Sequence, residues 1–187
     1  MNLSDFVRGY ANAASNELIE EMFDWFYNSK SAKTENPNRI TRKDLQKWVP
    51  VGTPLYNKIQ QVKFTMLDKY LQEFPYAYKG NLKLESEETK IQRTDINGGG
   101  FHNFHAEQSH YKNARRVLAW TIYLNDIPDG EGETQFLLEN IKVQPKKGMG
   151  CIFPASWMWQ HRGNPVYTES KYISTGWYLY PKEGKMD

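Results

Sequence analysis

In two segments of the first half of the chain, apolar residues recur every three or four positions, the spacing of one face of an α-helix. The first segment begins after Ser15, a residue that can cap a helix N-terminus. The second begins at Thr53 and Pro54, a capping residue followed by proline at the first helical position, and ends before Pro75. The two apolar stripes are Leu18, Ile19, Met22, Phe23 and Phe26, and Leu55, Ile59, Val62, Met66, Tyr70 and Phe74. Each predicted helix therefore needs a partner surface on which to pack.

Between these helices lies a polar and charged segment, residues 29–50, with the sequence SKSAKTENPNRITRKDLQKWVP. We interpret it as a long connection with a short helix around Arg42 to Lys47. Long connections inside compact domains are often functional, and this one could close over a site as a lid. A solvated insertion with no such role accounts for the same composition, and the pattern leaves both interpretations open.

From about Leu82 onward, short apolar runs alternate with glycine, asparagine, aspartate and proline. The runs IQRTDI, VLAWTIYL, TQFLL, IKV, GCIF and YISTGWYLY are typical of strands, and NGGG, NDIPDGEG, QPKKG and RGNP are typical of turns. Many short strands at this spacing favour a sandwich or a jelly-roll barrel. We therefore expect an α+β, mainly β protein of one domain, residues 1–187. In it, residues 1–80 form a helical support with the charged loop 29–50, and residues 81–182 form the jelly-roll core.

Composition narrows the function classes. The chain has 187 residues with 24 Lys and Arg against 22 Asp and Glu, so its net charge of +2 argues against a nucleic-acid binder. No apolar run reaches the length of a membrane span, and the start of the chain has no apolar signal-peptide core. The single cysteine, Cys151, cannot form an internal disulfide, which suits a reducing compartment. Aromatic residues make up 14% of the chain, which fits either a β-rich core or the walls of a ligand cavity.

The chain has 4 histidines, and His102, His105 and His110 lie together in the segment GGGFHNFHAEQSH. On an extended strand, alternate side chains point the same way, so His105 and Glu107 would point at a common position. His161 follows a later apolar strand, and a barrel could bring it to the same position. Two imidazoles and one carboxylate on one face form the facial triad of non-haem Fe(II) oxygenases. Such a short pattern also occurs as a pair of exposed polar residues, so spacing alone leaves both readings open.

Lys171 stands at the start of the last predicted strand, KYISTGWYLY. If its ammonium enters the barrel, a buried charge of this kind needs an anion, and a dicarboxylic co-substrate would supply one. The alternative is an ordinary lysine at the surface end of a strand.

Six motifs in the same order make residues 91–180 resemble the 2-oxoglutarate- and Fe(II)-dependent dioxygenases. The nearest likeness is to the prolyl 4-hydroxylase-like branch with its compact microbial and phage-encoded members. The motifs are HAE, RRVLAWTIYLND, GEGETQF, IKVQPKKGMGCIFP, HRGNPV and KYISTGWYLY. The resemblance implies a double-stranded β-helix, a cupin-like jelly-roll barrel, braced by N-terminal helices.

The resemblance also implies roles for individual residues. Fe(II) would be bound by His105, Glu107 and His161; the co-substrate by Lys171, Tyr123 and Thr175; and Trp177 and Arg116 would lie on the substrate side. Lys171 and Tyr123 would both contact the distal carboxylate of 2-oxoglutarate. The sequence departs from the family where Glu107 replaces the commoner aspartate, and where TDINGGG lacks the family's tyrosine. Gln92 or Thr94 could take the place of that tyrosine.

The activity implied is hydroxylation of a substrate carbon, most often a prolyl residue in a peptide or protein, using O2 and releasing succinate and CO2. Ascorbate is the expected reductant, and the cytoplasm, or the host cytoplasm for a viral protein, is the expected compartment. Two alternatives stay open: the same cofactor chemistry on a free amino acid or another small molecule, and a jelly-roll binding module without turnover. We expect no nucleic-acid or membrane partner, and the sequence does not indicate an oligomeric state.

Overall fold

The structure is a computed structural model that describes residues 2–31, 33–34, 42–75, 84–86, 88–96 and 99–182. Its helices are α1 (Asn16–Asn28) and α2 (Pro54–Glu73), with short 3-10 turns at Leu3–Phe6, Tyr111–Asn113, Leu138–Asn140 and Trp157–Trp159. Its strands are β1 (Arg8–Tyr10), β2 (Lys33–Thr34), β3 (Arg42–Lys43), β4 (Leu45–Trp48), β5 (Thr89–Thr94), β6 (Gly100–Phe101), β7 (Arg116–Tyr123), β8 (Thr134–Phe136), β9 (Lys142–Val143), β10 (Gly150–Pro154), β11 (His161–Gly163) and β12 (Lys171–Leu179).

Both predicted helices form, and both begin at the predicted caps. The Ser15 side chain accepts a hydrogen bond from the Leu18 amide at 3.3 Å, and Thr53 accepts one from the Tyr56 amide at 3.3 Å. Each bond satisfies an amide that has no partner within the helix. Among the residues that the structure describes, neither helix carries an apolar run that could cross a membrane.

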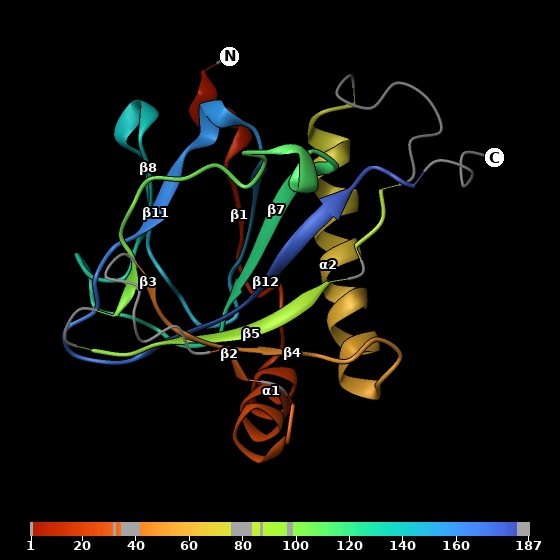
Figure 1. The fold of residues 1–187 in the computed structure, drawn as a ribbon, viewed down its shortest axis with the longest axis vertical. Coiled ribbons are helices and arrows are strands. Elements are labelled where there is room, and N and C mark those ends of the chain that lie inside the picture. Colours follow the sequence, from red (N-terminus) through yellow and green to blue (C-terminus); the bar gives the residue numbers. More distant parts are fainter. Residues whose placement is uncertain are drawn as a thin grey trace.

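The strands form one large sheet and two small ones. The large sheet has the antiparallel order β1-β10-β7-β12-β5-β4-β2, and the small sheets are β11-β8-β9 and β3-β6. In Figure 1, α2 and the β8–β11 pair lie on opposite sides of the large sheet. This jelly-roll arrangement confirms the predicted fold class.

The central strand β7 explains why the large sheet has two different faces. Its side chains alternate, and Trp120 and Ile122 pack into the apolar cluster formed with α1 and α2. Ala119 and Tyr123 belong to a second cluster on the other face, together with Phe136 of β8. Since successive residues of a strand point to opposite faces, one strand can support the helices and also line an interior space.

The prediction of a short helix around Arg42 to Lys47 is wrong, because this segment contains the strands β3 and β4. β4 pairs antiparallel with β5, so its backbone forms hydrogen bonds within the large sheet. The buried ammonium of Lys47 donates to the backbone oxygen of Ser29 at 2.9 Å, which ties β4 to the end of α1. Residues 32 and 35–41 of the predicted lid lie outside the described residues. Because β1 and β4 also form, residues 1–80 are not purely helical.

Candidate active site

The two histidines of the predicted triad are neighbours through their backbones. His105 lies outside the named strands and forms an isolated bridge with His161, the first residue of β11. Each backbone amide donates to the other's carbonyl, His105 to His161 at 3.0 Å and His161 to His105 at 2.9 Å. The expectation that a regular strand carries His105 and Glu107 is therefore wrong. The long-range bridge brings the imidazoles of His105 and His161 together, as was expected of a barrel.

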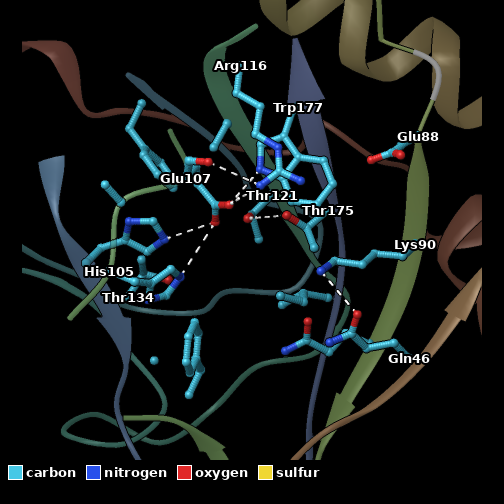
Figure 2. Close-up of a pocket in the computed structure, with 18 of the residues that line it drawn as sticks. Gln46, Glu88, Lys90, His105, Glu107, Arg116, Thr121, Thr134, Thr175 and Trp177 are labelled. Carbon is cyan, nitrogen blue, oxygen red and sulfur yellow. Dashed lines mark hydrogen bonds and ion pairs between the residues drawn. The ribbon is translucent and has the colours of Figure 1, made fainter. Parts of the chain in front are cut away.

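Glu107 completes the group. Its Oε1 lies 3.7 Å from His105 Nε2 and 3.5 Å from His161 Nε2. One ligand atom from each residue lies within 4.8 Å of the other two, an arrangement that could hold a metal ion. Figure 2 shows the His105 imidazole pointing toward the Glu107 carboxylate.

The backbone fixes the orientation of both rings. His105 Nδ1 lies 3.0 Å from the carbonyl oxygen of Asn103, and His161 Nδ1 lies 3.1 Å from that of Trp159. A carbonyl oxygen only accepts, so each Nδ1 donates to the backbone and each Nε2 is the ring atom that faces Glu107. Two neutral imidazoles and one carboxylate are the donor set that divalent iron takes in facial triads. The residues present therefore fit Fe(II).

The second oxygen of Glu107 is held from the other side. Trp177 Nε1 donates to Oε2 at 2.8 Å, and Arg116 Nη1 donates to Oε2 at 3.3 Å and to the Glu107 backbone oxygen at 3.2 Å. The guanidinium of Arg116 also stacks 3.4 Å from the centre of the Trp177 ring. Burial acts to raise the pKa of Glu107, but the two histidines outweigh it and hold the pKa well below its usual range. The carboxylate is therefore kept charged with Oε1 facing the imidazoles.

A cavity of about 670 Å³ opens beside the triad and extends to Lys171. Lys171 is only 5% exposed, and its ammonium donates to the carbonyl oxygen of Gly132 at 2.7 Å. Burial lowers the pKa of Lys171 to about 8, although the charges of Glu133 and Asp44 act to raise it. A buried cation at the end of a cavity is suited to an anionic ligand group.

The other predicted co-substrate residues are placed differently from one another. Thr175 lines the cavity, and its hydroxyl donates to the Trp120 carbonyl oxygen at 2.7 Å. Tyr123 is 1% exposed, and its hydroxyl shares a 2.8 Å hydrogen bond with Thr134, which does line the cavity. Tyr123 thus reaches the cavity through a neighbouring hydroxyl. Gln92 and Thr94, suggested as substitutes for the missing tyrosine, both line the cavity from β5.

Several cavity residues were not anticipated from the sequence, among them Gln46, Lys90 and Thr134. Lys90 was recoverable, because in the strand TKIQRT it alternates with Gln92 and Thr94 on one face. Gln46 was not, because the segment that contains it was expected to be a loop with a helix.

Comparison with known families and structures agrees with this geometry. Residues 89–179 match the sequence model of the family described as the 2OG-Fe(II) oxygenase superfamily. None of the curated protein sequences matches the chain.

Solved structures of similar fold come from several sources. A viral collagen prolyl hydroxylase from Paramecium Bursaria Chlorella virus-1, in complex with 2OG, has 18% identity and a TM-score of 0.71, covering 95% of this chain and 97% of that one. A Pseudomonas putida prolyl-4-hydroxylase has 16% identity and a TM-score of 0.70, covering 95% and 96%. A Trichoplax adhaerens prolyl hydroxylase, in complex with a hypoxia inducible factor peptide fragment, has 14% identity and a TM-score of 0.72, covering 95% and 84%.

Fold and site together define a jelly-roll protein with a His–Glu–His group that could hold a metal ion. Residues 89–179 form a domain of the 2OG-Fe(II) oxygenase superfamily, and the chain is an enzyme of that class. The family implies Fe(II), 2-oxoglutarate and O2, and the three ligands fit the iron. This assignment favours turnover over the alternative of a binding module.

Proposed function

We propose that the enzyme hydroxylates a prolyl residue of a peptide or protein, consuming 2-oxoglutarate and O2 and releasing succinate and CO2. The observation that carries the proposal is the continuity of one cavity from the His105, Glu107 and His161 ligand set to the buried ammonium of Lys171. Support for a prolyl substrate comes from structures of similar fold, which include prolyl hydroxylases. A peptide partner is supported by the Trichoplax structure, which holds a peptide fragment.

In this proposal each side chain has a defined task. His105, Glu107 and His161 hold Fe(II), and the metal with 2-oxoglutarate and O2 supplies the oxidising chemistry. Lys171 binds the distal carboxylate of 2-oxoglutarate as a point charge in a water-poor site.

Other side chains prepare this site. Tyr123 orients the hydroxyl of Thr134, and Thr175 lines the cavity between Lys171 and Trp177 on β12. Arg116 and Trp177 fix the Glu107 carboxylate and bound the space beside it, where the substrate would lie.

The test is mass spectrometry of proline-rich peptides incubated with protein, Fe(II), 2-oxoglutarate and O2. We expect a mass gain of one oxygen on proline, with succinate formed in equal amount. Ascorbate should extend the number of turnovers by keeping the iron ferrous. Glu107→Ala should reduce product at least about 100-fold because a metal ligand is lost.

The matched control is Glu20→Ala, which removes a carboxylate on the surface of α1 that pairs with Lys147 at 3.1 Å. We expect this variant to keep the wild-type rate. If the wild type forms no succinate with any peptide or amino acid, and His161→Ala changes no measured property, the protein binds without turnover and the proposal is wrong.

A further inference from the structure

One wall of the cavity is formed by polar side chains. Gln46 on β4 and Lys90 and Gln92 on β5 line this wall, and their exposed fractions are 9%, 6% and 8%. The register of the sheet sets Gln46 opposite Gln92 and Trp48 opposite Lys90. Polar groups of a ligand can hydrogen-bond to such side chains, whereas an apolar ligand surface cannot. This wall therefore suits a polar group of the ligand.

Lys90 is the charged member of the wall, and its neighbours hold it in place. Its ammonium donates to Gln46 Oε1 at 3.2 Å and lies 5.6 Å and 5.1 Å from the ring centres of Trp48 and Trp177. Gln46 Nε2 in turn donates to Asp44 Oδ2 at 2.8 Å, which turns the amide oxygen toward Lys90. Figure 2 shows Lys90 reaching from β5 toward Gln46 at the cavity wall.

Lys90 is distant from the residue proposed to bind 2-oxoglutarate. In the pairing of β12 with β5, Lys171 lies opposite Thr94 and Thr175 lies opposite Lys90. The two lysines are thus four strand positions apart in register, about 13 Å along the sheet. Lys90 instead lies beside Trp177, whose indole nitrogen holds Glu107. This places Lys90 on the substrate side of the metal ligands.

The second cation at this end of the cavity has a different task. Arg116 is bonded to Glu107 and stacked on Trp177. Glu88 also lines the cavity, and its charge acts on Arg116 together with that of Glu107. Arg116 therefore serves the metal-ligand carboxylate, whereas Lys90 bounds the adjoining space.

We propose that Lys90 is a specificity-determining residue that binds a carboxylate of the substrate next to the carbon that is oxidised. The inference rests on the proposed function and names its substrate class. The carboxylate has two chemical sources: an acidic residue beside the target proline in a peptide, or the α-carboxylate of a free amino acid. A fixed ammonium in a cavity of low water content discriminates strongly between a carboxylate and its neutral amide.

The test compares acid and amide forms of otherwise identical ligands. One pair is a proline-containing peptide with Glu or Gln beside the proline, and the other is L-proline and L-prolinamide. KM is measured by oxygenated product, and binding to the metal-free protein is measured by tryptophan fluorescence. In one of these two pairs, the one that matches the substrate class, we expect the acid to bind about tenfold more tightly than the amide. The pair that shows this preference identifies the source of the carboxylate.

Two variants and one control connect the preference to Lys90. Lys90→Met keeps the side-chain length and removes the charge, and Gln46→Glu keeps the lysine but places a carboxylate against it. Both should reduce the acid-to-amide ratio to about one. Lys58→Met removes an exposed ammonium on α2 that pairs with Glu21 at 2.6 Å, and it should keep the wild-type ratio.

Equal binding of acid and amide by the wild type, or a ratio that survives in both Lys90→Met and Gln46→Glu, would overturn the inference. In that case the proposed function still stands if a neutral peptide is oxygenated. If no ligand is oxygenated, the proposed function fails, and the binding ratios on the metal-free protein still decide the role of Lys90.

Discussion

At the scale of single residues, the site depends on polar groups that are buried with defined partners. Lys171 shows this most clearly, because its ammonium donates to the carbonyl oxygen of Gly132 and lies near Gly163. The Cβ of a larger residue at position 163 would be in van der Waals contact with Lys171 Nζ, at 3.6 Å. A bound carboxylate would stabilise the charged form of this lysine, whereas burial in the free enzyme favours the neutral form.

This balance predicts a pH dependence for 2-oxoglutarate. The pKa of Lys171 is lowered by burial to about 8, and in its proposed role the protonated form would bind the carboxylate of 2-oxoglutarate. We therefore expect kcat/KM for 2-oxoglutarate to fall above about pH 8, since this parameter reports the free enzyme. Lys171→Ala should raise KM for 2-oxoglutarate at every pH and remove this fall, with a much smaller change in KM for the peptide.

Lys146→Ala is the control for that experiment, because Lys146 is exposed and pairs with Asp129 at 3.4 Å. Steady-state succinate release is measured from pH 6 to pH 9 for the wild type, Lys171→Ala and Lys146→Ala. Equal changes in KM for 2-oxoglutarate and peptide in Lys171→Ala would contradict the role given to Lys171.

At the scale of elements, α2 is attached to the sheet partly through a buried lysine within its apolar stripe. Lys63 is 0% exposed, and its ammonium donates to the Ser86 carbonyl oxygen at 3.0 Å and to Thr89 Oγ1 at 2.9 Å. It also lies 4.9 Å from the centre of the Trp120 ring. The stripe predicted from spacing omitted this position, because a lysine in a sequence is normally read as exposed.

Lys63 should make stability depend on pH. Burial lowers the pKa of Lys63 from 10.5 to about 7. Between these values the unfolded chain binds more protons than the folded one, so the free energy of unfolding rises with pH across this window. One proton contributes a slope of up to about 1.4 kcal/mol per pH unit, and the gain is lost as pH falls back toward 7.

Urea unfolding of wild type and Lys63→Met at several pH values from 7 to 10 measures this slope. We expect the variant to lose the contribution of one proton, and Lys58→Met, from the exposed side of α2, to retain it. Identical slopes in wild type and Lys63→Met would show that Lys63 is not responsible.

At the scale of the whole molecule, one sheet serves both the support and the site. Its helix-facing cluster includes residues of α1, α2, β7 and β12, and its other face lines the cavity. The ligands come from segments far apart in sequence that meet only in the folded chain. Binding of a metal to them must therefore stabilise the folded state as a unit.

We accordingly expect a divalent ion to raise the thermal midpoint. Zn²⁺ is a suitable probe because it has no redox chemistry. At a free concentration 100 times its dissociation constant, it should add about 2.7 kcal/mol to the free energy of unfolding, and a chelator should reverse this. Calorimetry of wild type, His161→Ala and His110→Ala provides the comparison.

His110 lines the cavity but is not one of the three grouped ligands, so His110→Ala should keep the metal effect that His161→Ala loses. If both variants lose it, or neither does, the metal is bound elsewhere.

Local signals were sufficient for much of the fold. Caps at Ser15 and Thr53 and short apolar runs predicted both helices and most strands of the second half, because these features act within a few residues. β6 and β11 were not predicted, because NGGG and RGNP were interpreted as turns. Local signals failed where pairing partners are distant. β4 was read as helical, and β1 was not predicted, although it pairs with β10 across most of the chain.

The same division applies to the function. The amino-acid sequence by itself determined the kinds of ligand atoms, their order along the chain and the periodicity of the elements, since these are local properties. Only the tertiary structure decided that His105 and His161 share a bridge, that Glu107 is held by Arg116 and Trp177, and that Lys63 and Lys90 are buried. Burial and long-range pairing depend on the register of the whole sheet, which no short segment specifies.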